Sequence, residues 1–405
     1  MRLLPAVFGI VAVPLMFLLG KRLFGARAGL LAATLVAFSP WHIYWSQYGR
    51  YYTLVFLLSA TFPILLFTGV QGRSPRVIMA GVALAVLAIL AHPSAGLVLA
   101  GCGVWLTLRS GGLSLLLSRR LAVRVAAALA ALATCIVAYR LIIQLRQWYN
   151  LSQDWGFDGV TLVLSYLVWL VPVLVVFSVA GIIWMWLEFD RPLASFLAAS
   201  IGVPIILLVP LSFVVPVSTS YLFATAPFAF LAAAFFLDRL AAMGPRIAHQ
   251  EMLMIACLVA VLVAGGPGLI SHYVDGNRAD FRAAAQFVVR HATDDGTILS
   301  DQARVLAHYL DSRPVLPLRR DVSDLTQDIE RARSETRTED VWLVVAIKRR
   351  GGFYEQGLGT ASHWFRGHCE LRSSFGRPRL DHKHNELQVY HCTRSPGSAG
   401  TQSDS

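Results

Sequence analysis

Ionisable side chains are scarce in the first two thirds of this 405-residue sequence, and no Asp or Glu occurs before Asp154. Charged residues make up only 15% of the chain and hydrophobic residues 56%, a larger apolar share than soluble domains have. Residues 3–270 instead contain repeated apolar runs of roughly 17–25 residues, the length that a helix needs to cross a bilayer. The composition therefore excludes an ordinary soluble protein and predicts a polytopic membrane protein.

The same scarcity argues against a transport pathway through the membrane. Transporters and flippases place ionisable residues or broken helices near the bilayer midplane. Arg140 comes nearest to such a position, and its long side chain can extend to the membrane surface. The net charge of +11 does not indicate nucleic-acid binding, because many basic residues lie in short loops, where membrane orientation explains them. A transporter or flippase is the less favoured function.

We predict about ten membrane spans from the apolar runs. They are residues 3–20, 28–44, 51–70, 77–91, 95–108, 121–143, 160–187, 192–213, 221–237 and 252–270. The fourth and fifth spans are short and meet at His92, Pro93 and Ser94. They form either a helix hairpin with a tight turn or a single broken helix.

Basic residues follow the odd-numbered spans far more often than the even-numbered ones. After the odd-numbered spans come Lys21, Arg22, Arg27, Arg73, Arg76, Arg109, Arg119, Arg120, Arg124, Arg191, Arg239 and Arg246. The even-numbered loops contain Arg50 and Arg146 alone. Because Lys and Arg accumulate in cytoplasmic loops, the odd-numbered loops are expected inside. Arg50, His92 and the whole C-terminal region are then extracytoplasmic, and we expect the protein in the cytoplasmic (inner) membrane.

The composition changes after residue 270, where the chain becomes charged and compatible with water. We divide it into a membrane domain of residues 1–270, a small α/β domain of residues 271–393 and a disordered tail of residues 394–405. Helices are expected at 280–291, 302–310 and 324–333, and strands at 297–300, 341–347, 370–374 and 386–391.

Only five cysteines occur, and their spacing does not indicate a metal site. Cys102, Cys135 and Cys257 fall inside predicted spans and are expected to pack there. Cys369 and Cys392 lie in the last two predicted strands, in a compartment that permits disulfides. We therefore predict a disulfide between them. The run from Asp381 to His384 resembles a metal-ligand cluster, but a turn between two strands is the favoured interpretation, and we predict no metal site.

An aromatic stretch, SPWHIYWSQYGRYY, occupies residues 39–52 at a predicted membrane face. Trp and Tyr are typical of the headgroup layer, so an interfacial belt with one surface-reaching Arg is one interpretation. That belt does not explain Gln47 and Arg50 among the rings. An Arg surrounded by Tyr hydroxyls can hold a phosphate or carboxylate through planar, paired hydrogen bonds.

Four pieces of the sequence carry a resemblance to a known superfamily. They are GKRLFGARAGLLAA at 20–33, the aromatic stretch at 39–52, His92 with Pro93, and DGNRADFRAAAQFV at 275–288. These resemble the bacterial GT-C membrane glycosyltransferases of the protein O-mannosyltransferase-like group, which includes the lipid A aminoarabinose transferases. The resemblance implies a GT-C-like fold and transfer of a sugar from a polyprenyl-phosphate donor to a lipid, glycan or protein acceptor outside the cytoplasm.

A lipid-phosphate leaving group needs fixed positive charge where its negative charge develops. The substrate-binding candidates are therefore Arg50, with Gln47 and Tyr51 or Tyr52 as hydrogen-bonding neighbours, and His92 at the same face. The sequence identifies no cofactor with certainty and leaves a requirement for a divalent cation open.

Two departures from the superfamily pattern leave an alternative. The family's acidic residue in the first outer loop would lie upstream of Met1, so we assign no catalytic residue and expect that the start is misassigned or truncated. The family also often has Glu at the position of Tyr48 and a basic residue near Ser220. Asp154 and Asp158 are outer-loop carboxylates, best explained by loop solvation. The alternative to a transferase is a catalytically inactive or truncated scaffold of the same fold.

Overall fold

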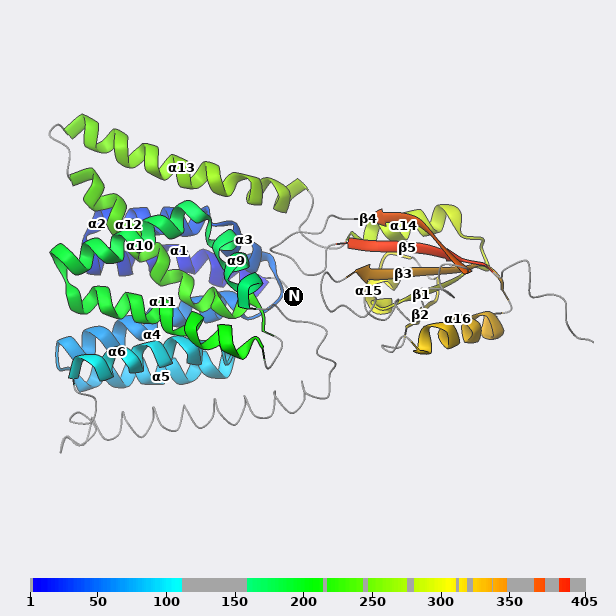
Figure 1. The fold of residues 1–405 in the computed structure, drawn as a ribbon, viewed down its shortest axis with the longest axis horizontal. Coiled ribbons are helices and arrows are strands. Elements are labelled where there is room, and N and C mark those ends of the chain that lie inside the picture. The colour runs from blue at the N-terminus through cyan, green and yellow to red at the C-terminus, as the bar shows by residue number, and fades with distance from the viewer. Residues whose placement is uncertain are drawn as a thin grey trace, which may run out of the picture. The chain divides into compact units, whose positions relative to one another are not determined.

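The computed structural model describes residues 3–110, 159–213, 217–242, 247–274, 280–310, 313–318, 323–336, 338–347, 368–375 and 386–393. The chain divides into two compact units, with the division between Leu269 and Ile270 (Figure 1). The predicted span 121–143, the loop containing Asp154 and Asp158, the turn from Asp381 to His384 and the predicted tail lie outside the described residues.

The first unit is helical. Its described elements are α1 (Leu3–Phe24), α2 (Ala26–Ala37), α3 (Pro40–Gln47), α4 (Tyr52–Gln71), α5 (Pro75–Ala91), α6 (Ala95–Ser110), α9 (Gly159–Leu170), α10 (Pro172–Trp184), a π-helical turn η1 (Met185–Phe189), α11 (Arg191–Leu211), a 3₁₀ segment η2 (Thr219–Thr225), α12 (Ala226–Ala242) and α13 (Ile247–Val274).

Five described segments are long and apolar enough to cross a membrane. They are Leu3–Phe24, Tyr52–Gln71, Pro172–Phe189, Arg191–Leu211 and Thr219–Ala242. The shorter apolar helices are Ala26–Ala37, Pro75–Ala91, Ala95–Arg109 and Met254–Ile270. These helices make the chain a membrane protein, whereas the total of about ten spans stays a prediction.

Two predicted spans are interrupted in the structure. The prediction of one helix over 160–187 is wrong, because α9 ends at Leu170 and Val171 adopts φ 68° before Pro172 starts α10. Proline disfavours the helical conformation in the residue before it, and this constraint outweighed the continuous apolar pattern. The span 28–44 is likewise divided, into α2 and α3, where Ser39 precedes Pro40.

Glycines allow the helices to pack closely. A Cβ added to Gly29 on α2 would lie 2.5 Å from the carbonyl oxygen of Phe17 on α1. A Cβ on Gly181 of α10 would overlap the carbonyl oxygen of Ala232 on α12. Small residues are typical of helix interfaces in membranes, where close van der Waals contact drives association.

The direction of the helices gives the helical unit two ends. At one, which we call the Arg27 end, Arg27 donates to the backbone carbonyl of Asp238 at 3.2 Å. Trp105 also donates there, to the carbonyl of Pro192, at 3.0 Å. The lengths of helices α2, α6 and α12 separate these residues from the segments 38–52, 91–95 and 217–221, which therefore lie at the opposite end, the Arg50 end.

In its described residues, the second unit contains a five-stranded mixed sheet that is covered on both faces. The strands β1 (Thr297–Ser300), β2 (Val315–Pro317), β3 (Val341–Ile347), β4 (Cys369–Phe375) and β5 (Glu386–Cys392) have the order β2-β1-β3-β5-β4. The first three are parallel, and β5 runs antiparallel to β3 and β4. The helices are α14 (Phe281–His291), α15 (Ala303–Ala307) and α16 (Ser323–Thr336) (Figure 1).

Alternate residues of β3 build two separate cores in this unit. Leu343 and Val345 pack with Ile329 of α16, whereas Trp342 packs with Ala285 of α14. Successive side chains of a strand point to opposite faces of the sheet, and both faces are buried here. This explains why the segment VWLVVAI is apolar throughout.

Candidate functional site: the Arg50 end of the helical unit

The connection between α3 and α4 presents Arg50. Ser39 caps the start of helix α3, and its side chain accepts a hydrogen bond from the backbone N–H of His42 at 3.3 Å. It ends at Gln47, and the Arg50 N–H then donates to the Tyr48 carbonyl at 2.6 Å in a tight turn. Helix α4 begins two residues later, at Tyr52. A capped helix start and a tight turn thus fix where the guanidinium emerges.

Two further segments meet this connection. The turn between α5 and α6 contributes His92, whose ring stacks on Tyr51 with centroids 4.6 Å apart and an interplanar angle of 21°. The segment η2 contributes Tyr221, whose ring centroid lies 5.4 Å from that of His92. Tyr52 completes the aromatic group at 5.7 Å from His92. The structure thereby brings Arg50, Tyr51, Tyr52 and His92 together.

The two adjacent tyrosines have different surroundings. Tyr52 is only 4% exposed, and its hydroxyl lies 3.0 Å from the hydroxyl of Ser220, which in turn donates to Ser218 at 2.9 Å. Tyr51 is 38% exposed at the start of α4. Between the two sequence candidates, Tyr51 is therefore the one accessible to a ligand, and Tyr52 anchors η2. Gln47 lies exposed at the end of α3.

Arg50 is an exposed cation that lies beside an aromatic ring. Its Cζ atom lies 5.5 Å from the centroid of the Tyr48 ring. Among the described residues, no carboxylate lies within ion-pair distance of it. Burial lowers the pKa of His92, in the turn outside the apolar helices, to about 4, and the Arg50 charge contributes to this shift. The site therefore combines one fixed positive charge with a neutral imidazole, which suits an anion.

Sequence reasoning did not assign Ser94, Ser220 or Tyr221 to this group. The sequence did predict that the turn 92–94 and the loop before residue 221 lie at this membrane face, and this was the one indication that their residues could join the site. Which of their side chains meet Arg50 and Tyr51 depends on tertiary packing.

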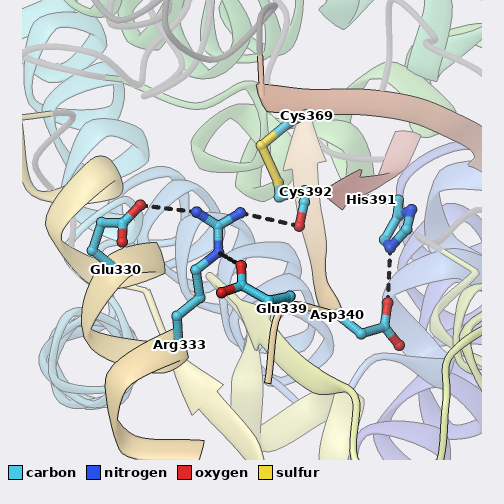
Figure 2. The surroundings of a disulfide bond; sticks show 7 residues. All are labelled: Glu330, Arg333, Glu339, Asp340, Cys369, His391 and Cys392. Atoms are coloured by element: carbon cyan, nitrogen blue, oxygen red, sulfur yellow. Dashed lines mark hydrogen bonds and ion pairs between the residues drawn. A yellow bond between two sulfur atoms is a disulfide. The ribbon is translucent and has the colours of Figure 1, made fainter. Parts of the chain in front are cut away.

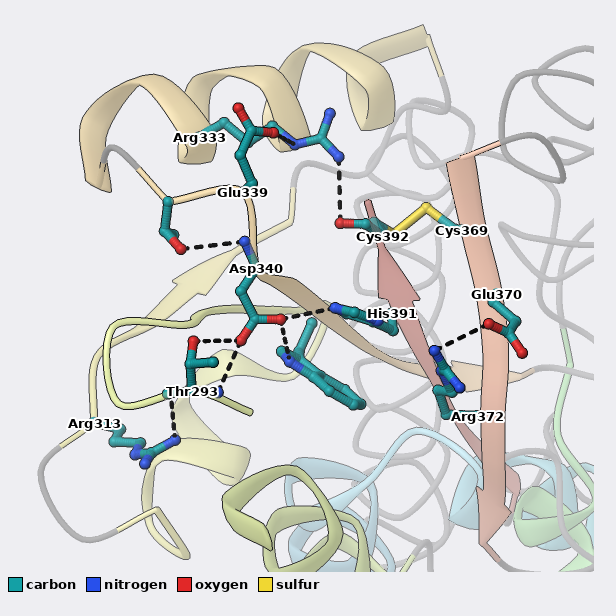
Figure 3. A network of polar contacts seen from close by, with 12 residues as sticks. Thr293, Arg313, Arg333, Glu339, Asp340, Cys369, Glu370, Arg372, His391 and Cys392 are labelled. Carbon is teal, nitrogen blue, oxygen red and sulfur yellow. Dashed lines mark hydrogen bonds and ion pairs between the residues drawn. A yellow bond between two sulfur atoms is a disulfide. The ribbon is translucent and has the colours of Figure 1, made fainter. Parts of the chain in front are cut away.

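The polar network of the α/β unit is built differently (Figure 3). Asp340 accepts hydrogen bonds from the backbone and hydroxyl of Thr293, at 2.8 and 2.6 Å. It also accepts from the indole of Trp342 at 2.9 Å and lies 2.7 Å from Nε2 of His391. Burial raises the pKa of the Asp340 carboxyl, but the bonds from Thr293 and His391 outweigh it and hold that pKa below its usual value. With both oxygens occupied, Asp340 joins β3, β5 and the segment before β1 and is not available to a ligand.

A disulfide joins Cys369 of β4 to Cys392 of β5 (Figure 2). Arg333 of α16 lies beside it and donates to the carbonyl oxygen of Cys392 at 3.3 Å and to Glu330 at 2.8 Å. Within the described part of the chain, no group of three or more His, Cys, Asp or Glu could hold a metal ion. The features of this unit are structural, and the candidate site is the Arg50 end.

Comparisons with known proteins bear on the fold. No family model matches the chain, and no curated protein matches it. The crystal structure of ArnT from Cupriavidus metallidurans in the apo state is similar to this chain, with a TM-score of 0.52 and 14% sequence identity over 96% of this chain and 83% of the ArnT chain. The ArnT structure bound to undecaprenyl phosphate has a TM-score of 0.49 and 15% identity over the same shares. ArnT is a GT-C glycosyltransferase, and the present chain has a GT-C-like fold.

Proposed function

We propose that this protein transfers a sugar from a polyprenyl-phosphate donor to a lipid, glycan or protein acceptor at the outer face of the cytoplasmic membrane. The GT-C-like fold supports a sugar transfer of this kind. The distribution of basic loop residues supports an extracytoplasmic position for the Arg50 end and for the α/β unit.

The observation that carries the proposal is Arg50 without a carboxylate partner among the described residues, beside Tyr51 and His92. When the bond between the sugar C1 and the phosphate oxygen breaks, the lipid phosphate gains negative charge. A planar guanidinium stabilises that charge through two parallel hydrogen bonds, and it stabilises the transition state more than the ground state. The acceptor hydroxyl forms the new bond to C1 and loses its proton to a base that we do not assign.

The aromatic side chains next to Arg50 fit the rest of such a donor. Tyr44, Trp45 and Tyr48 lie along α3 and its end, with ring centroids 4.8 Å apart for Tyr44 and Trp45 and 5.5 Å apart for Tyr44 and Tyr48. Aromatic rings favour the headgroup layer of a membrane, where the phosphate of a polyprenyl lipid lies. A donor anchored by its lipid chain would thus present its phosphate at the level of Arg50.

Replacement of Arg50 by Lys tests the proposal. Lys keeps the charge and can still reach the membrane surface, but it lacks the planar fork that holds a phosphate. We expect turnover of a polyprenyl-phosphate sugar to fall by roughly thirty- to a thousandfold, which corresponds to about 2–4 kcal/mol in the transition state. The measurement is donor consumption against a panel of polyprenyl-phosphate sugars.

Arg239→Lys is the matched control, because the Arg239 guanidinium also lies on aromatic rings, 4.8 Å from Phe189 and 5.4 Å from Phe235, at the Arg27 end. We expect this variant to keep normal turnover. Near-normal turnover of Arg50→Lys at normal expression would reduce Arg50 to a membrane anchor. No consumption of any donor by the unaltered protein would favour the inactive scaffold.

A further inference from the structure

The imidazole of His92 is held by its own turn through one ring nitrogen. Its Nδ1 atom lies 3.2 Å from the backbone nitrogen of Ser94 and 2.7 Å from the Ser94 hydroxyl oxygen. A backbone N–H can only donate, so Nδ1 must accept and cannot carry a proton. The hydroxyl, which can donate or accept, then also donates to Nδ1. In the neutral ring the proton is therefore on Nε2, directed away from the turn.

Aromatic neighbours fix the plane of the same ring. Tyr51 stacks on it, and Tyr52 and Tyr221 contact it at tilted angles of 51° and 43°. Ser94 itself is 5% exposed, so water competes little for its hydroxyl. The ring thus has a fixed plane and a fixed protonated nitrogen, which are the two requirements of a preorganised hydrogen-bond donor.

We propose that Ser94 is a positioning residue that holds His92 as a neutral Nε2–H donor to the lipid phosphate bound by Arg50. The proposal rests on the function proposed above and adds a second phosphate-binding group of different chemistry. Among the described residues, Arg50 is the charged group that acts on His92, and the other ionisable groups that face the ring are the hydroxyls of Tyr51, Tyr52 and Tyr221. A second cation beside Arg50 would be repelled by it, whereas a neutral N–H adds a hydrogen bond without that repulsion. The low pKa of His92 agrees with this neutral role.

Two substitutions of His92 separate a donor from a ring that only packs. The amide nitrogen of Gln reaches the place of Nε2, and that of Asn reaches only the place of Nδ1. We expect His92→Gln to bind a polyprenyl phosphate within about threefold of the unaltered protein, and His92→Asn to bind it about tenfold more weakly, the effect of one lost hydrogen bond to a charged group. Equal losses in both variants would show that only the stacked ring matters and would overturn the proposal.

Variants of Ser94 test the positioning role. Ser94→Ala removes the hydroxyl but keeps the backbone N–H bond, so we expect binding about 3–10-fold weaker, while Ser94→Thr, which restores a hydroxyl, regains most of the affinity. In protein labelled with ¹⁵N-histidine, the His92 signals, identified by their loss in His92→Gln, should report an unprotonated Nδ1 whose chemical shift changes in Ser94→Ala, because that nitrogen then accepts one hydrogen bond fewer. The control is Ser195→Ala, whose hydroxyl donates to Pro192 of its own helix at 2.9 Å.

The His92 ¹⁵N signals and the polyprenyl-phosphate affinity distinguish a failure of the Ser94 inference from a failure of the proposed function. A protonated Nδ1 in the unaltered protein would overturn the inference about Ser94 whatever binds at Arg50. An unprotonated Nδ1 in a protein that binds polyprenyl phosphate no better than polyprenol would instead overturn the proposed function and, with it, the phosphate role of His92.

Discussion

Arg333 in the α/β unit and Arg50 in the helical unit have opposite surroundings. Arg333 is 7% exposed and is surrounded by oxygen atoms: those of Glu330, the Cys392 carbonyl and, at 3.8 Å, Glu339 (Figure 2). Arg50 is exposed and has an aromatic face beside it in place of carboxylates among the described residues. The protein supplies acceptors to both terminal nitrogens of this structural arginine. At Arg50 we propose that the substrate supplies them.

Arg27 supports the same distinction within the helical unit. Its guanidinium forms an ion pair with Asp238 and also donates to the carbonyl oxygen of that residue. It lies at the opposite end from Arg50, which the distribution of basic loop residues predicts to face the cytoplasm. In the helical unit, an arginine that stabilises the fold is thus paired with a carboxylate, as Arg27 is with Asp238.

The largest stability effect is expected at Arg333. Arg333→Met would leave the Cys392 carbonyl without its donor and break the contacts to two glutamates, so we expect a loss of about 1–3 kcal/mol in the free energy of unfolding of the α/β unit. Thermal unfolding of the full chain, followed by limited proteolysis within residues 271–393, measures it. Arg372→Met is the control, because its pair with Glu370 is exposed on both sides and should change stability by less than about 0.5 kcal/mol. Equal effects of the two substitutions would contradict the structural role of Arg333.

A carboxylate placed beside Arg50 should make that arginine resemble Arg27. Gly49 is exposed next to it. Among the described glycines, only Gly25 has a positive φ, so the backbone at position 49 has no left-handed conformation that would exclude a side chain. We expect Gly49→Asp to weaken polyprenyl-phosphate binding by about 3–10-fold through charge compensation, without lowering the unfolding temperature. Gly49→Asn, of the same shape without charge, should bind nearly normally. Equal losses in both variants would assign the effect to shape and not to charge.

The smallest effect concerns the pH dependence of the α/β unit. The pKa of Asp340 is lower in the folded protein than in the unfolded chain, so its contribution to stability is present above the unfolded value of about 4 and is lost as the pH falls through the lower folded value. Asp340→Asn should therefore be less stable at pH 7 and lose less stability on acidification. Protease resistance of residues 271–393 between pH 7 and pH 3 measures both. Parallel pH curves for the two proteins would show that Asp340 is not the responsible group.

The sequence predicted the elements whose pattern is long and regular. Apolar runs located the helices, and the segments 297–300 and 341–347 are strands β1 and β3. The break at Val171 was missed, because an apolar run conceals the effect of Pro172. Strand β2 was missed because three residues carry no periodicity. The contacts of Ser94, Ser220 and Tyr221 were not predictable, since they join segments that tertiary packing alone brings together.

The central claim is that Arg50 recognises the phosphate of a polyprenyl lipid. The most direct measurement compares the affinity of the full chain for a polyprenyl phosphate and for the polyprenol of the same length, in the unaltered protein and in Arg50→Gln. We expect the unaltered protein to prefer the phosphate by about tenfold or more, and Arg50→Gln to lose most of this preference while it still binds the polyprenol. Arg239→Gln should keep the preference. An undiminished preference for the phosphate in Arg50→Gln would contradict the account.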